Sequence, residues 1–86
     1  MQIVRTERFK RAYKRLTPAQ RKAVDKALFQ LVEGSNPGGL GKKRIQHTRD
    51  IWEARESKSV RITFEQHDDR IILRNTGDHD KVLKNP

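Results

Sequence analysis

The apolar residues change their spacing along the chain, and this change constrains the fold more than any other feature. Up to about residue 32 they recur every three or four residues, as in an amphipathic helix; from residue 51 they alternate with polar residues, as in a half-buried strand. A chain of 86 residues has room for one small domain, which we expect to span residues 1–86. Helices that precede a run of strands predict the α+β class.

Start and stop signals divide the first part of the chain into a short strand, residues 2–5, and a two-helix hairpin. Thr6 is a capping residue for the first helix. Thr17 and Gln20 have the spacing of a capping box and predict the start of the second helix. Gly34 is a typical residue for the end of that helix.

Three alternating segments follow a glycine-rich loop at residues 35–41. Residues 51–56, 60–65 and 70–75 predict strands joined by tight turns, which is an antiparallel β-meander. We therefore expect the meander to be packed on one face by the helices.

The turn lengths predict which residues lie opposite one another, and opposite residues share a face of the sheet. A three-residue turn at 57–59 sets Trp52 against Phe64, and a four-residue turn at 66–69 sets Phe64 against Ile71. The face predicted to meet the core carries Trp52, Ala54, Val60, Ile62, Phe64, Ile71 and Leu73.

The same register gathers charged residues on the opposite, uncovered face. It places Glu53 beside Thr63, Arg55 beside Arg61, and Arg61 beside Arg74. Arginines placed directly opposite one another destabilise a sheet unless something compensates for their charge. A bound phosphate would do so, because guanidinium groups grip phosphate with two hydrogen bonds. The alternative is that the arginines extend into water and Glu53 screens them.

Two histidines are candidates for proton transfer near this face. Gly77 permits a turn after the last strand, so His79 can fold back over the face, and His47 can approach from the other rim. An imidazole has a pKa near ~6.5 and exchanges protons at neutral pH. The alternative for each is an ordinary solvated loop histidine, which is the reading we prefer for His67.

The positive charge lies almost entirely in the first half of the chain. Residues 1–49 hold thirteen Lys or Arg and three acidic residues, whereas residues 50–86 hold seven and eight, and the whole chain has a formal net charge of +9. Such a field attracts nucleic acid or another polyanion. The helical lysines among these residues are equally typical of a solvated helix face.

Composition excludes several other classes. The chain has no cysteine, so it has no disulfide and no thiolate metal ligand, and its three scattered histidines make a zinc site improbable. No apolar run approaches the roughly 18 residues of a membrane span. We expect a cytoplasmic protein without a cofactor and without a membrane partner.

Three strings together resemble the RelE/ParE superfamily of toxins from toxin–antitoxin systems. They are IWEAR at 51–55, VRITF at 60–64 and NTGDHDKVL at 75–83, in an order and spacing that match nearly the whole chain. The mRNA interferase branch, which contains RelE, YoeB and YafQ, is the most similar. Arg61 matches its strand arginine, His79 matches the T-G-x-H histidine of YafQ-like members, and Glu53 resembles the carboxylate of YoeB-like members. The chain lacks the late tyrosine of RelE.

The resemblance implies an endoribonuclease that cuts mRNA in the ribosomal decoding site by attack of a ribose 2′-OH on the adjacent phosphate, without a metal. Such a reaction needs a base, an acid and cations that stabilise the charge on phosphorus. We assign Glu53 as the base, with His47 as the alternative base, and His79 as the acid. Arg55, Arg61 and Arg74 are the predicted charge stabilisers, and Lys22, Lys26, Lys42, Lys43 and Arg44 are the predicted contacts to RNA backbone.

The expected partners are the ribosome, mRNA and an acidic antitoxin that covers the basic surface. The toxin alone is expected to be a monomer that forms a higher-order complex with its antitoxin. Two alternatives stay open: a ParE-like poison of DNA gyrase without nuclease activity, and a non-catalytic RNA-binding domain. The second is weaker because the chain has only five aromatic residues on which bases could stack.

Overall fold

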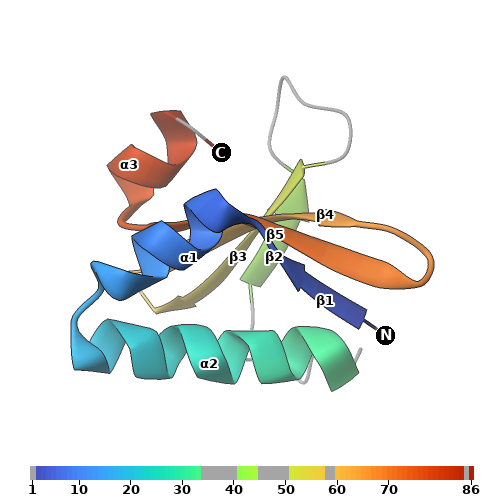
Figure 1. Ribbon diagram of the computed structural model, residues 1–86, viewed down its shortest axis with the longest axis horizontal. Coiled ribbons are helices and arrows are strands. Elements are labelled where there is room, and N and C mark those ends of the chain that lie inside the picture. The colour runs from blue at the N-terminus through green and yellow to red at the C-terminus, as the bar shows by residue number, and fades with distance from the viewer. Residues whose placement is uncertain (1, 34–40, 45–50, 58–59, 85) are drawn as a thin grey trace.

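The computed structural model describes residues 2–33, 41–44, 51–57, 60–84 and 86. It confirms the α+β class, with helices and strands in an order close to the predicted one (Figure 1). The elements are β1 (Gln2–Arg5), α1 (Glu7–Lys14), α2 (Pro18–Glu33), β2 (Gly41–Arg44), β3 (Ile51–Ser57), β4 (Val60–Gln66), β5 (Arg70–Gly77) and α3 (His79–Lys84).

The two predicted helix starts are confirmed by their hydrogen bonds. The Thr6 hydroxyl accepts a hydrogen bond from the Phe9 N–H at 3.1 Å and so caps α1. At the start of α2 the Gln20 N–H donates to the Thr17 hydroxyl at 3.1 Å, and the Thr17 N–H donates to the Gln20 side-chain oxygen at 3.0 Å. This is the reciprocal pair of a capping box. The predicted helix stop at Gly34 lies outside the described residues.

The five strands form one mixed sheet in the order β1-β5-β4-β3-β2. Strands β3 to β5 pair antiparallel, as the predicted meander requires. The strand β2 adds antiparallel to β3, and β1 adds to the free side of β5 in parallel. The strand β2 has the sequence GKKR. It was not predicted because it has no apolar residue and therefore no alternation to reveal it.

The predicted register is correct for one strand pair and wrong for the other. Trp52 lies opposite Phe64 between β3 and β4, as expected. Between β4 and β5, however, Phe64 lies opposite Leu73 and not Ile71. The predicted turn was too long: the His67 N–H donates to the Arg70 carbonyl at 2.9 Å, which closes a tighter turn. A further irregularity beside Phe64 shifts the pairing again toward the end of β5.

The predicted core face is confirmed, because both register errors leave the apolar residues on the same side. Trp52 is partly buried and packs against the core, and the remaining predicted residues are at most 1% exposed. From the helices α1 and α2 and the turn between them, the buried residues that complete this core are Phe9, Leu16, Val24, Ala27, Leu28 and Leu31.

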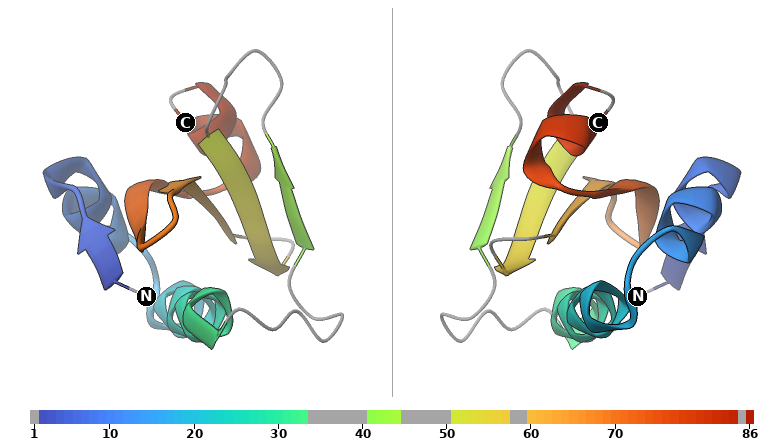
Figure 2. Two further views of the ribbon diagram at one scale, coloured as in Figure 1. Left: turned by 90° about the vertical axis from the view of Figure 1, so that its right-hand side faces the viewer. Right: turned by 90° about the vertical axis from the view of Figure 1, so that its left-hand side faces the viewer.

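The opposite face is not open, which corrects the prediction. The six-residue helix α3 contacts β4 and β5 and lies on the other side of the sheet from α2 (Figure 2). Its Val82 is fully buried. Gly77, at φ +153°, makes the turn into α3 in a conformation that side chains rarely adopt. So short a helix leaves no periodic signal in the sequence. None of the helices in the described ranges is long and apolar enough to cross a membrane.

Candidate functional site

Two neighbouring rows of residues cross the sheet beneath α3. Each row contains one residue from each of β2, β3, β4 and β5, paired directly opposite one another. The first row is Lys43, Glu53, Thr63 and Asn75; the second is Gly41, Arg55, Arg61 and Gly77.

Glu53 and Arg61 form a buried ion pair where the two rows meet. The Arg61 Nε lies 3.4 Å from Glu53 Oε1, and the two side chains are only 11% and 4% exposed. They are diagonal neighbours on β4 and β3, a position from which long side chains reach one another. The sequence prediction that these two residues lie on one face and close together is confirmed.

The second carboxylate oxygen of Glu53 is left without a partner. Among the described residues, Glu53 Oε2 is buried and accepts no hydrogen bond. Buried polar atoms in folded proteins almost always have a partner, and an exception calls for an explanation. A buried ion pair also adds little to the stability of a fold, because the free energy needed to remove two charges from water is about as large as the free energy of their attraction. Gln30 Oε1, on α2, is the other buried side-chain atom without a partner among the described residues. Glu53 Oε2 differs from it in belonging to a charged side chain beside a guanidinium, which makes it the candidate for chemistry at this site.

Arg55 supplies a second guanidinium at this place. It lies directly opposite Arg61 in the register, as predicted, but its side chain is exposed. The Glu53 carboxylate offsets part of the charge of Arg61, which eases the repulsion expected between two arginines on adjacent strands. The pair of arginines thus presents one buried and one accessible cation.

Arg74 does not belong to this group, which corrects the predicted row of three arginines. The shift in register sets Gly77, and not Arg74, opposite Arg61. Arg74 instead donates a hydrogen bond to Glu65 at 2.5 Å. The carbonyl oxygen of Pro86 accepts two hydrogen bonds, one from Arg74 Nε at 3.4 Å and one from the Arg8 guanidinium at 2.8 Å.

The surroundings of Glu65 act on its pKa in opposite directions. Burial raises the pKa, but hydrogen bonds from Arg74 and His67 outweigh burial, so that the pKa of Glu65 is lowered from its ordinary value. His67 lies 3.2 Å from Glu65 Oε1. Arg74 and His67 therefore serve a structural cluster on β4 and β5.

The backbone places His79 close to the two rows. It is the first residue of α3 and follows Gly77, the partner of Arg61, by two positions. The sequence prediction of a turn at Gly77 is confirmed, and the helix α3, which was not predicted, follows it. His47 lies outside the described residues.

The predicted RNA-contacting cations fall into two groups. Lys22 and Lys26 are exposed on α2, which packs against the core face and so lies on the other side of the sheet from Glu53. Lys42, Lys43 and Arg44 form most of β2. The register brings Lys43 directly opposite Glu53, a placement that could not be predicted without recognising β2 as a strand.

Asn75 is a residue of the site that the sequence did not identify. It closes the first row opposite Thr63, and its side-chain oxygen accepts a hydrogen bond from the Thr76 N–H at 2.9 Å. The Thr76 hydroxyl in turn donates to the Arg61 carbonyl at 2.8 Å. The predicted register paired this part of β5 differently, which hid Asn75 from the prediction.

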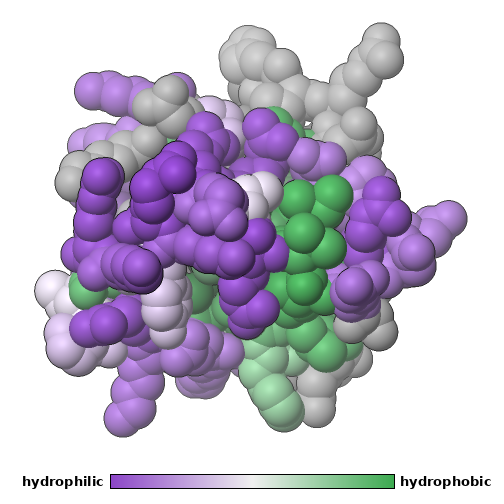
Figure 3. Space-filling model, in the orientation of Figure 1, coloured by the Kyte–Doolittle hydropathy of each residue, from purple (hydrophilic) through white to green (hydrophobic). Residues whose placement is uncertain are grey.

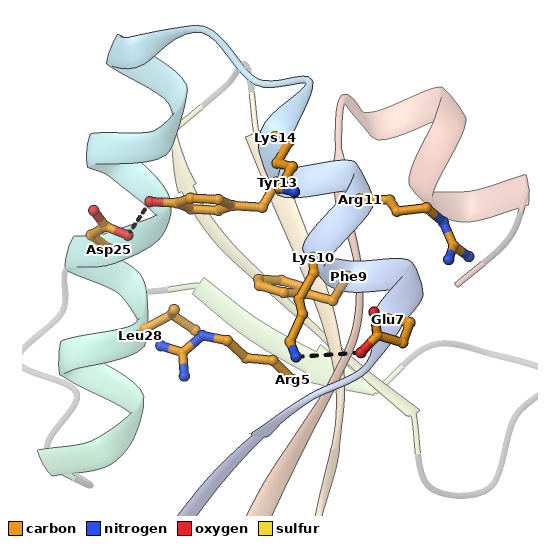
Figure 4. Close-up of a pocket in the computed structure, with 9 residues that line it drawn as sticks. All are labelled: Arg5, Glu7, Phe9, Lys10, Arg11, Tyr13, Lys14, Asp25 and Leu28. Atoms are coloured by element: carbon orange, nitrogen blue, oxygen red, sulfur yellow. Dashed lines mark hydrogen bonds and ion pairs between the residues drawn. The ribbon is translucent and has the colours of Figure 1, made fainter.

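A second surface feature is a cavity of about 380 Å³ at the side of the molecule formed by β1, α1 and α2 (Figure 4). Phe9, Tyr13 and Leu28 supply apolar groups to its lining, and Arg5 and Lys14 are among the cations beside them.

The Tyr13 hydroxyl crosses from α1 to α2 and donates to Asp25 at 2.8 Å. This hydrogen bond, together with burial and the charge of Asp25, raises the pKa of Tyr13 above its ordinary value. An apolar area also lies over β1 and the adjacent end of α2 (Figure 3), where the large exposed apolar residues are Val4, Phe29 and Val32.

The fold is similar to several solved toxins. A metal-bound toxin from Helicobacter pylori superposes with a TM-score of 0.80 at 14% identity, over 95% of this chain and 98% of that one. RelE in the RelB–RelE antitoxin–toxin complex of Methanococcus jannaschii gives 0.76 at 19% identity, over 96% and 99%. YafQ from E. coli gives 0.75 at 13% identity, over 94% and 96%.

Sequence comparison alone finds no relative: neither a protein family model nor a curated protein sequence matches the chain. The structural similarity nevertheless covers almost the full length of both partners in each superposition. The chain therefore has the fold of the RelE-like toxins.

Proposed function

We propose that the protein is the toxin of a toxin–antitoxin pair and acts as an endoribonuclease that cuts mRNA on the ribosome. The observation that carries this proposal is the unpartnered Oε2 of Glu53 beside Arg61. A carboxylate oxygen without a partner can accept a proton, and the adjacent guanidinium can hold phosphate. The RelE-like fold and the net charge of +9 support the same conclusion.

The proposed reaction is an attack of a ribose 2′-oxygen on the adjacent phosphorus. Glu53 takes the 2′-hydroxyl proton, the new 2′-O–P bond forms, and the P–O5′ bond breaks. His79 gives a proton to the departing 5′-oxygen, which leaves as a 5′-hydroxyl, and the other product ends in a 2′,3′-cyclic phosphate. Arg61 and Arg55 stabilise the negative charge on phosphorus in the transition state.

Access to the carboxylate is part of this proposal. With the Glu53 side chain only 4% exposed, a 2′-hydroxyl reaches Oε2 after the groups that cover this face have parted. Arg55 is exposed and can contact the RNA backbone before that step. The site in its resting state thus protects the carboxylate and leaves one cation available.

The proposed partner is an acidic antitoxin. M. jannaschii RelE was solved bound to the antitoxin RelB. In this chain the cavity in Figure 4 combines an apolar lining with the cations Arg5 and Lys14, which suits an acidic segment that inserts an apolar side chain. Val4 on β1 and Phe29 on α2 are exposed apolar residues of two elements that form the cavity.

The test uses purified protein and ribosomes programmed with a defined mRNA. Glu53→Gln keeps the size of the side chain and removes the base, so we expect the cleavage rate to fall by about 10²–10⁴-fold. Glu65→Gln is the matched control, because Glu65 is also a strand glutamate that pairs with an arginine but lies in a different cluster. His79→Ala and Arg61→Ala should likewise lose activity and relieve growth arrest, while circular dichroism reports a folded chain.

A Glu53→Gln protein that cleaves as fast as wild type refutes the assignment of the base. If the wild-type protein leaves ribosome-bound mRNA intact and blocks supercoiling by DNA gyrase, the nuclease proposal is wrong and the ParE-like alternative is correct.

A further inference from the structure

A second cavity, of about 340 Å³, opens at the end of β5 where that strand meets α1 and α3. Its sheet side is formed by Asn75, Thr76 and Gly77, and its helix side includes Arg15 and Lys84. It is separate from the cavity in Figure 4, with which it shares no lining residue.

The register connects this cavity to the candidate site. Asn75 ends the row that contains Glu53, and Gly77 lies opposite Arg61. Adjacent strands are about 4.8 Å apart, so the two strand steps from Glu53 to Asn75 span about 10 Å. A nucleotide neighbouring the cleaved bond in the same RNA strand can lie over this distance.

The charges of the cavity favour an anion. Within the described ranges, the side chains of Arg15 and Lys84 make no hydrogen bond and no ion pair, and both are exposed. Arg15 is fixed in position by its backbone, since it caps α1 through a hydrogen bond from its N–H to the Ala12 carbonyl at 3.1 Å. The lining also includes one acidic residue, Asp78, so the cavity carries two cations with unused donors against one carboxylate. Arg15 directly follows α1, which Phe9 anchors in the core.

We propose that this cavity is a phosphate subsite, in which Arg15 and Lys84 bind the phosphate of a nucleotide next to the cleaved bond in single-stranded RNA. This inference rests on the proposed nuclease function. The subsite binds the substrate and takes no part in bond cleavage, because neither Arg15 nor Lys84 belongs to the rows that hold Glu53 and Arg61.

The experiment measures single-turnover cleavage by the full chain on ribosomes programmed with a short synthetic mRNA, over a range of protein and salt concentrations. Arg15→Gln and Lys84→Gln should each raise the half-saturating protein concentration several-fold and leave the maximal rate unchanged. The Arg15→Gln/Lys84→Gln double variant, which removes both contacts to the phosphate, should lower the slope of log affinity against log salt by about 0.7, the value for one phosphate contact to a single strand. Arg70→Gln, at the far end of β5, is the charge-matched control and should not change the slope.

A set of mRNAs with one uncharged methylphosphonate linkage at successive positions then locates the contact. At the contacted linkage, wild-type affinity should fall to that of the Arg15→Gln/Lys84→Gln double variant, and the double variant should lose nothing further. The subsite is overturned if Arg15→Gln and Arg70→Gln have equal effects, or if the loss from Arg15→Gln and the loss from the uncharged linkage add at every position. Cleavage by the wild-type protein in the same experiment upholds the nuclease. Absence of cleavage by wild type overturns both.

Discussion

Substitution of Gly77 by alanine should destabilise the protein through backbone strain. Gly77 has φ +153°, where an L-residue is strained by about 1–3 kcal/mol. Alanine also restricts the unfolded chain, which returns about 0.4–1 kcal/mol. The middle of each range leaves a net loss of about 1.3 kcal/mol, which corresponds to a fall in Tm of about 5–10 °C for a domain of this size.

The structure separates strain from steric conflict as the cause of this loss. A Cβ on Gly77 would lie 3.6 Å from Val82 Cγ2, an ordinary contact, so no clash is expected. Val82→Ala alone should cost about 2 kcal/mol, because it removes two buried methyl groups. In the double variant the two losses should add if strain is the cause.

Thermal and urea unfolding of the two single variants and the double variant provide the measurement. Gly41→Ala, in the extended backbone of β2, is the control and should have little effect. The reasoning is refuted if Gly77→Ala unfolds at the wild-type temperature, or if Val82→Ala rescues it. Because His79 follows Gly77 by two residues, Gly77→Ala should also lower cleavage activity.

Two further predictions concern stability. Glu65 has a lowered pKa in the folded protein, so its stabilising effect is complete above the ordinary pKa of 4.5 and is lost as the pH falls through the folded pKa. The urea midpoint of the wild-type protein should therefore drop more steeply below about pH 4.5 than that of Arg74→Gln. Parallel curves for the two proteins would contradict this. Thr17→Ala removes the hydroxyl that caps α2 and should lower the free energy of unfolding by about 1 kcal/mol, whereas Thr17→Ser should keep most of it; equal losses in both variants would show that the hydroxyl is not responsible.

The parts of the fold that the sequence predicted are those with a local signal. The capping residues Thr6 and Thr17 determine where α1 and α2 begin, and both were identified from residue type and spacing alone. Alternation identified β3, β4 and β5, and the register between β3 and β4 followed from one turn length. As a result, the Glu53–Arg61 pair was predicted correctly.

The remaining parts depend on tertiary contacts. Arg74 was assigned to the site because the tight turn at His67 and the register shift beside Phe64 leave no recognisable pattern in the sequence. The strand β2 forms because β3 offers it a partner, and α3 forms because Val82 finds a buried position against the sheet. Both elements change the site: one sets Lys43 opposite Glu53, and the other covers the face that was expected to be open.

We expect the protein to cut ribosome-bound mRNA through the site at Glu53 and Arg61, and the ends of the fragments report this most directly. Purified protein is mixed with ribosomes programmed with an mRNA that is labelled at both its 5′ and its 3′ end. The 5′-labelled fragment should end in a 2′,3′-cyclic phosphate and the 3′-labelled fragment should begin with a 5′-hydroxyl, and both should be absent with Glu53→Gln and present with Glu65→Gln. Intact mRNA with the wild-type protein, or fragments that persist in Glu53→Gln, would contradict this expectation.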